Sequence, residues 1–69
     1  MFDMVKAGQT IKSLRKNLGY TVEKVSKDIG VSSSSFSKYE AGERIPRDEV
    51  KEKIANYFNK SLNFIFFSY

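Results

Sequence analysis

The sequence contains no cysteine and no histidine. It therefore has no disulfide framework, none of the usual ligands of a zinc site, no thiol nucleophile and no imidazole base. No apolar run approaches the roughly 20 residues that a membrane-spanning helix needs, and the N-terminus lacks the charged, apolar and small-residue order of a signal peptide. We expect a cytoplasmic protein that recognises a partner, without catalysis, metal, cofactor, membrane or small-molecule ligand.

The charge that is present is unevenly distributed. The formal net charge is +4, and residues 1–47 contain nine bases against five acids, whereas residues 48–69 contain three of each. A basic region suits a polyanion such as DNA, but an ordinary solvated surface explains the same excess equally well.

Apolar residues spaced three or four apart predict a first helix over roughly residues 7–18. Its stripe consists of Ala7, Ile11, Leu14 and Leu18. Two shorter helices follow, each beginning after a hydroxyl cap and ending at a glycine. The caps are Thr21 and Ser32, and the glycines are Gly30 and Gly42.

The rest of the chain predicts two more helices. Pro46 precedes a fourth helix whose inward stripe is Val50, Ile54, Ala55 and Phe58. Ser61 is expected to cap a last turn or two, with Leu62, Ile65 and Phe66 turned inward. Because no stretch alternates like a strand and no repeat or linker is present, residues 1–69 are interpreted as one compact all-α domain of five helices.

Residues 22–41, VEKVSKDIGVSSSSFSKYEA, carry a spaced pattern of apolar residues with one small residue and one glycine among them. The patterned residues are Val25, Ser26, Ile29, Gly30, Val31, Phe36 and Tyr39. Two helices that cross over a tight turn need such a pattern: a glycine free to adopt a positive φ, a small residue where the backbones approach, and apolar residues on the facing sides. The segment predicts a helix-turn-helix unit, although helical hairpins that bind nothing satisfy part of the pattern.

Several short motifs resemble the phage Cro and repressor family, also called the xenobiotic response element type of helix-turn-helix regulators. They are I-K-x-L-R at residues 11–15, G-x-T at 19–21, Y-E-x-G at 39–42 with its following proline, and K-I-A at 53–55. The resemblance covers nearly the whole chain. It implies a lambda-repressor-like domain that docks its third helix in the major groove of DNA, usually as a dimer on a pseudopalindromic operator.

The serine run at residues 32–35 is unusual in a helix, because serine competes for backbone hydrogen bonds. A helical projection separates a short polar face from a core face. The polar face has Ser33, Ser34, Ser37, Lys38 and Ala41, and the core face has Ser35, Phe36, Tyr39 and Glu40. Short side chains let a helix approach base edges, so we expect base contacts from Ser33, Ser34, Ser37 and Lys38. The alternative is a flexible turn.

Contacts with DNA phosphates are expected from residues that flank this face: Thr21, Val22, Ser32 and Arg44. Thr21 and the amides that open the second helix offer a phosphate seat. In the resembled family a glutamine often follows the threonine, whereas Val22 can supply only its backbone N–H, and the loop that contains Arg44 commonly grips the DNA backbone. Solvated charge is the alternative for Lys38 and Arg44.

A structural set accompanies these residues. The resemblance implies an ion pair between Arg15 and Glu40 that ties the first helix to the third. Gly30, Phe36 and Tyr39 are expected to form the turn and the core of the helix-turn-helix unit.

Six of the ten aromatic residues lie near the C-terminus: Tyr57, Phe58, Phe64, Phe66, Phe67 and Tyr69. A short last helix cannot bury all of them, so we expect an exposed apolar patch that forms a homodimer contact through Phe64 and Phe67. The alternative is a monomer in which Phe2 and Met4 cover the tail.

These observations predict a sequence-specific transcriptional regulator that binds double-stranded DNA, and a repressor because no separate activation region is evident. The alternative is an antitoxin-like or accessory module that uses the same fold to bind another protein, with weak or no DNA binding. We do not expect an enzyme, since the chain lacks histidine, cysteine, a glycine-rich phosphate loop and a convincing carboxylate pair.

Overall fold

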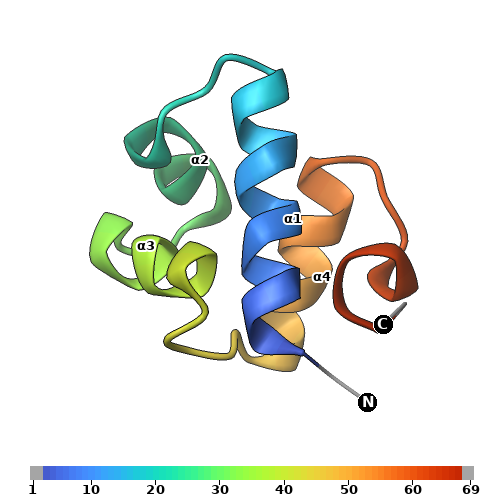
Figure 1. Ribbon diagram of the computed structural model, residues 1–69. Helices are drawn as coiled ribbons and strands as arrows, with labels where there is room; N and C mark the ends of the chain where they lie inside the picture. The colour runs from blue at the N-terminus through green and yellow to red at the C-terminus, as the bar shows by residue number, and fades with distance from the viewer. Residues whose placement is uncertain (1–2, 68–69) are drawn as a thin grey trace.

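A computed structural model of the chain describes residues 3–67, without the side chain of Phe67. The described part forms α1 (Met4–Asn17), α2 (Val22–Ile29), α3 (Ser33–Ala41), α4 (Asp48–Tyr57) and a short π-helix, η1 (Asn63–Phe67). Helix α1 stands at the centre, with α2 and α3 on one side and η1 on the other (Figure 1). Helix α4 contacts α2. The predicted all-α fold of five helical elements is confirmed.

Helix α1 begins three residues earlier than predicted, because Asp3 caps it. The Asp3 carboxylate accepts hydrogen bonds from the backbone N–H groups of Val5 and Lys6, at 3.0 and 3.1 Å. The apolar stripe gave no sign of this start, since residues 4–6 are exposed. The stripe also ends earlier than predicted: Leu18 is 51% exposed, so its assignment to the core is wrong.

Helices α2 and α3 have the predicted bounds. The hydroxyl oxygens of Thr21 and Ser32 each accept a hydrogen bond from the backbone N–H three residues later, both at 3.0 Å. Gly30 and Gly42 end the helices with φ angles of 92° and 74°, which residues with a side chain rarely adopt. Specific residues therefore fix both ends of each short helix.

One cluster of buried apolar side chains joins all five elements. Its members are Ala7, Ile11, Val25, Ile29, Phe36, Tyr39, Ile54, Ala55, Phe58, Ile65 and Phe66. Helix α3 contributes Phe36 and Tyr39, whose rings meet edge to face with centroids 6.3 Å apart. Since four of the nine residues of α3 are serines, this packing, rather than helix propensity, stabilises the helix.

The C-terminal element is a π-helix instead of the predicted α-helical turn. The hydroxyl of Ser61 accepts a hydrogen bond from the backbone N–H of Phe64 at 3.1 Å, as expected of a cap. Ile65 and Phe66 are buried and Leu62 is half-buried, as predicted. None of the helices described here has the length and apolar character needed to cross a membrane.

Gly8 marks a close approach of α1 to α3 that the sequence pattern does not predict. A Cβ atom at this position would meet the backbone carbonyl oxygens of Tyr39 and Glu40, the latter at 2.6 Å. These are main-chain atoms inside a helix, so they cannot move aside unless α3 itself shifts. The absence of a side chain at Gly8 thus sets how closely the two helices pack.

We predict that Gly8→Ala lowers the free energy of unfolding by about 1 to 3 kcal/mol, because the added methyl forces α1 and α3 apart. Alanine has the higher helix propensity, so a helix without this contact would gain stability instead. Urea denaturation followed by circular dichroism measures the difference. Ser13→Ala, at an exposed position of the same helix, is the control and should leave stability unchanged or slightly raised. A Gly8→Ala protein at least as stable as the control would contradict the close packing.

Candidate nucleic-acid interface

Helix α3 presents a continuous polar face to solvent. Ser33, Ser34, Ser37, Lys38 and Ala41 are all exposed, and we call these five residues the serine face. On the opposite side Phe36 and Tyr39 are buried, and Ser35 and Glu40 are half-buried. The projection from sequence therefore divides the helix correctly, and the flexible-turn alternative is wrong.

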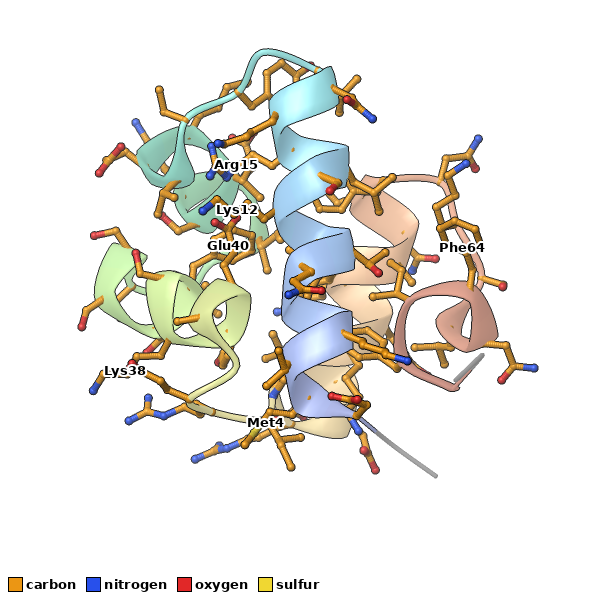
Figure 2. The ribbon with its side chains drawn as sticks, in the orientation of Figure 1. Met4, Lys12, Arg15, Lys38, Glu40 and Phe64 are labelled. Carbon is orange, nitrogen blue, oxygen red and sulfur yellow. The ribbon has the colours of Figure 1, made fainter. Side chains whose placement is uncertain are left out.

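An ion pair between α1 and α3 fixes the orientation of the serine face. Arg15 donates from Nε and Nη2 to the two carboxylate oxygens of Glu40, at 2.7 and 3.0 Å, and from Nη1 to the carbonyl oxygen of Tyr20 at 2.9 Å. The side chains of Arg15 and Glu40 are only 11% and 7% exposed. Figure 2 shows them pointing toward each other in the space between α1 and α3. The pairing of Arg15 with Glu40 is the one that the family resemblance implies. Arg15 also holds the turn before α2, through its hydrogen bond to the carbonyl oxygen of Tyr20.

The hydrogen bonds from Arg15 to Glu40 raise the pKa of Arg15 above its ordinary value, although partial burial opposes this shift. Arginine is charged throughout the working range of proteins in any case. The bidentate geometry gives the pair a defined orientation as well as energy. Any rotation or sliding of α3 along α1 would therefore break this ion pair.

The predicted phosphate contacts lie at two helix starts and one loop. Thr21 and Ser32 are exposed and immediately precede α2 and α3. The side chain of Val22 packs against the core, so only its backbone is available to a ligand. Arg44 is exposed in the loop between α3 and α4.

Arg44 also lines a hollow, of about 590 Å³, between the start of α3 and the start of α4. The lining residues are Val31, Ser32, Ser35, Tyr39, Arg44, Ile45, Arg47, Glu49 and Val50. The sequence pattern predicts no binding role for Ser35 or Arg47. No local signal could have placed them here, because the hollow forms only when the loop folds back onto α3.

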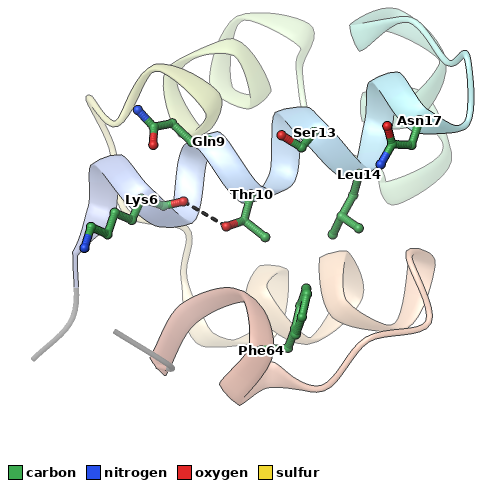
Figure 3. Close-up of a pocket in the computed structure, with 7 residues that line it drawn as sticks. All are labelled: Lys6, Gln9, Thr10, Ser13, Leu14, Asn17 and Phe64. Carbon is green, nitrogen blue, oxygen red and sulfur yellow. Dashed lines mark hydrogen bonds between the residues drawn. The ribbon is translucent and has the colours of Figure 1, made fainter.

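Phe64 lies apart from the serine face, on the other side of α1 (Figure 2). Phe64 is 48% exposed. Together with Leu14 it faces a shallow hollow of about 560 Å³ along the polar side of α1 (Figure 3). The other lining residues are Lys6, Gln9, Thr10, Ser13 and Asn17.

Among the aromatic residues near the C-terminus, the described ones are placed as predicted. Phe58 and Phe66 are buried and Tyr57 is half-buried, which leaves Phe64 as the exposed ring of the segment among the described side chains. The side chain of Phe67, and Tyr69, lie outside the described part of the chain, as does Phe2 of the monomer alternative. Met4 is 37% exposed.

A second polar contact ties α2 to α4, away from the serine face. The hydroxyl of Tyr57 donates to Asp28 Oδ2 at 2.7 Å, and Lys24 Nζ donates to the same oxygen at 3.2 Å. These two hydrogen bonds lower the pKa of Asp28. Burial, together with the hydrogen bond to Asp28, raises the pKa of Tyr57 to about 12. No described group of acidic side chains is arranged to hold a metal ion.

The crossed α2 and α3, the glycine turn between them and the exposed serine face define a helix-turn-helix domain. Comparison with known proteins agrees: the helix-turn-helix family model matches residues 11–65. The chain is 35% identical over 54 residues to the uncharacterised HTH-type transcriptional regulator YazB of Bacillus subtilis, and the match covers 78% of each protein. The chain belongs to the Cro/repressor-type helix-turn-helix family.

Two further similarities extend the comparison. The chain is 31% identical over 55 residues to a protein of Pyrococcus horikoshii provisionally named an HTH-type transcriptional regulatory protein. That match covers 80% of this chain but only 18% of the larger protein. The crystal structure of the clp gene regulator ClgR from C. glutamicum superposes with a TM-score of 0.79, covering 90% of this chain and 80% of that one. At 19% identity this similarity shows a common fold.

We predict that Glu40→Gln lowers the free energy of unfolding by about 3 kcal/mol, because it leaves the largely buried guanidinium of Arg15 without its counter-charge. Equilibrium unfolding in urea measures the loss. Glu43→Gln removes the same charge from an exposed position three residues on and should change stability by no more than about 0.5 kcal/mol. Equal stability of the two variants would mean that the ion pair does not hold α3.

Proposed function

We propose that this chain is the DNA-binding domain of a transcriptional regulator, and that it reads double-stranded DNA by inserting α3 into the major groove. The observation that carries the proposal is the exposed serine face on a helix whose other side is buried and tied to α1 by a bidentate ion pair. Family membership and the names of the relatives support it.

The chemistry of the serine face suits groove reading. Serine side chains are short, so the backbone of α3 can approach the base edges, and each hydroxyl can donate or accept a hydrogen bond. Ser33, Ser34 and Ser37 supply these contacts, and Lys38 reaches a base edge or a phosphate beside them. Because hydroxyls accept either partner, part of the sequence preference comes from bridging water and DNA shape.

Phosphate contacts position the helix around this face. Thr21 and the backbone N–H of Val22 open α2 at one flank, where unpaired helix amides attract an anion. Ser32 and Arg44 lie at the other flank, where the guanidinium can bind a phosphate with two hydrogen bonds. Such contacts set register and orientation without carrying sequence information.

The regulator acts as a cytoplasmic repressor on a pseudopalindromic operator, as a homodimer that forms through the C-terminal segment with Phe64 and Phe67. Phe64 is separated from α3 by α1, so a second copy bound there leaves the serine face uncovered (Figure 2). Covering a half-exposed ring beside Leu14 gives this contact its apolar component.

A second function has one observation in its favour. The side chain of Val22 is packed against the core, so the start of α2 lacks a polar side chain at this position that could reach DNA. An antitoxin-like or accessory module that mainly binds another protein would tolerate valine at this position, where related regulators often have glutamine. The two functions differ in their dependence on salt, since phosphate contacts release counterions and apolar contacts do not.

We predict that the protein binds duplex DNA with an affinity that falls steeply as salt rises. Lys38→Ala and Arg44→Ala should each reduce the slope of log K against log salt by about 0.9 for every phosphate that the variant no longer neutralises. Fluorescence anisotropy with a labelled duplex measures the slope. The control is Lys60→Ala, since Lys60 lies 5.1 Å from the ring of Phe64, on the other side of α1, and should leave the slope unchanged. Binding that does not respond to salt, or no binding at all, would favour the protein-interaction module.

A further inference from the structure

Ser35 belongs to the serine run but does not lie on the serine face. It is half-buried and lines the hollow beside the loop that follows α3, together with Arg44 and Arg47. The helical projection places Ser35 on the core side of α3, where a hydroxyl adds nothing to apolar packing. Its contacts give it a different role.

The hydroxyl oxygen of Ser35 accepts two hydrogen bonds. One comes from the hydroxyl of Ser32 at 3.0 Å, and the other from Nη1 of Arg44 at 3.2 Å. A hydroxyl oxygen has two acceptor positions, so both are filled. Ser32 is itself fixed, because its oxygen accepts the backbone N–H of Ser35 in the helix cap. A short chain of hydrogen bonds therefore connects Arg44 to the first turn of α3.

This connection matters because a free arginine side chain is costly to order. Arg44 is exposed and its long side chain would otherwise sample many rotamers, which a ligand must restrict on binding. A serine hydroxyl that holds one guanidinium nitrogen leaves the other N–H groups free to bind a phosphate. The contact also links the Arg44 side chain to the first turn of α3, next to the serine face.

The surroundings favour an anion over a purely structural purpose. Arg44 and Arg47 line the same hollow, and Glu49 is the acidic residue that faces it. If the Ser35 contact served only stability, an apolar residue at this half-buried position would do as well, since a single exposed hydrogen bond contributes little to folding. We infer that Ser35 is a positioning residue that holds Arg44 ready for a backbone phosphate of DNA; this inference rests on the proposed function.

A double-mutant cycle tests the inference, with a fluorescently labelled mixed-sequence duplex as the probe, since phosphate contacts do not depend on sequence. Ser35→Ala should weaken binding by about three- to tenfold, the effect of leaving one long side chain to be ordered by the ligand on binding. In the Arg44→Ala background, Ser35→Ala should have no further effect, because the residue acts through Arg44. Ser35→Thr keeps the hydroxyl and should restore most of the wild-type affinity.

Stability and an exposed polar residue of α4 provide the controls. Ser35→Ala should leave the free energy of unfolding unchanged or slightly raised, since alanine is the better helix former. Asn56→Ala, at an exposed position of α4, should bind duplex as the wild type does. If the wild type binds and Arg44→Ala weakens binding, but Ser35→Ala binds normally or adds its effect to that of Arg44→Ala, the inference is overturned and the proposed function stands. If the wild type binds no duplex, both are overturned.

Discussion

The contact between α1 and α3 is the constraint on which the rest of the structure depends. Gly8 lets the two backbones come close, and the bidentate pair of Arg15 with Glu40 fixes their rotation. Helix α3 needs both, because a nine-residue segment rich in serine does not form a stable helix by propensity alone. Its shape and direction are imposed by the core and by α1.

This support explains how α3 can carry so many serines. Phe36 and Tyr39 supply the buried area, while caps at both ends pair some of the backbone groups that a short helix leaves without partners. The exposed side is then free to be chosen for a ligand rather than for stability. We interpret the serine face in this way: its residues are poor for folding but suited to close approach to bases, and the proposed phosphate contact of Arg44 adds the charge that hydroxyls lack.

Local signals predicted the helix-turn-helix unit well, and contacts distant in sequence account for the errors. Thr21, Ser32, Gly30 and Gly42 mark the ends of α2 and α3 through their own backbone and side-chain chemistry, so these bounds could be predicted. The ion pair of Arg15 and Glu40 followed from family resemblance and not from spacing. The sequence did not reveal the close approach at Gly8, the exposure of Leu18, the link from Ser35 to Arg44 or the contact of Tyr57 with Asp28, because each depends on which segments meet in three dimensions.

The most direct test of the account is a selection of bound duplexes from a random pool, carried out with the wild type and with the Ser33→Ala, Ser34→Ala double variant. The serine face is the proposed reading surface, so we expect the wild type to recover a defined half-site and the variant to recover a different or relaxed one. The variant should still fold and keep its salt-dependent binding, because phosphate contacts remain. Recovery of the same half-site by both proteins would show that the serine face does not read DNA.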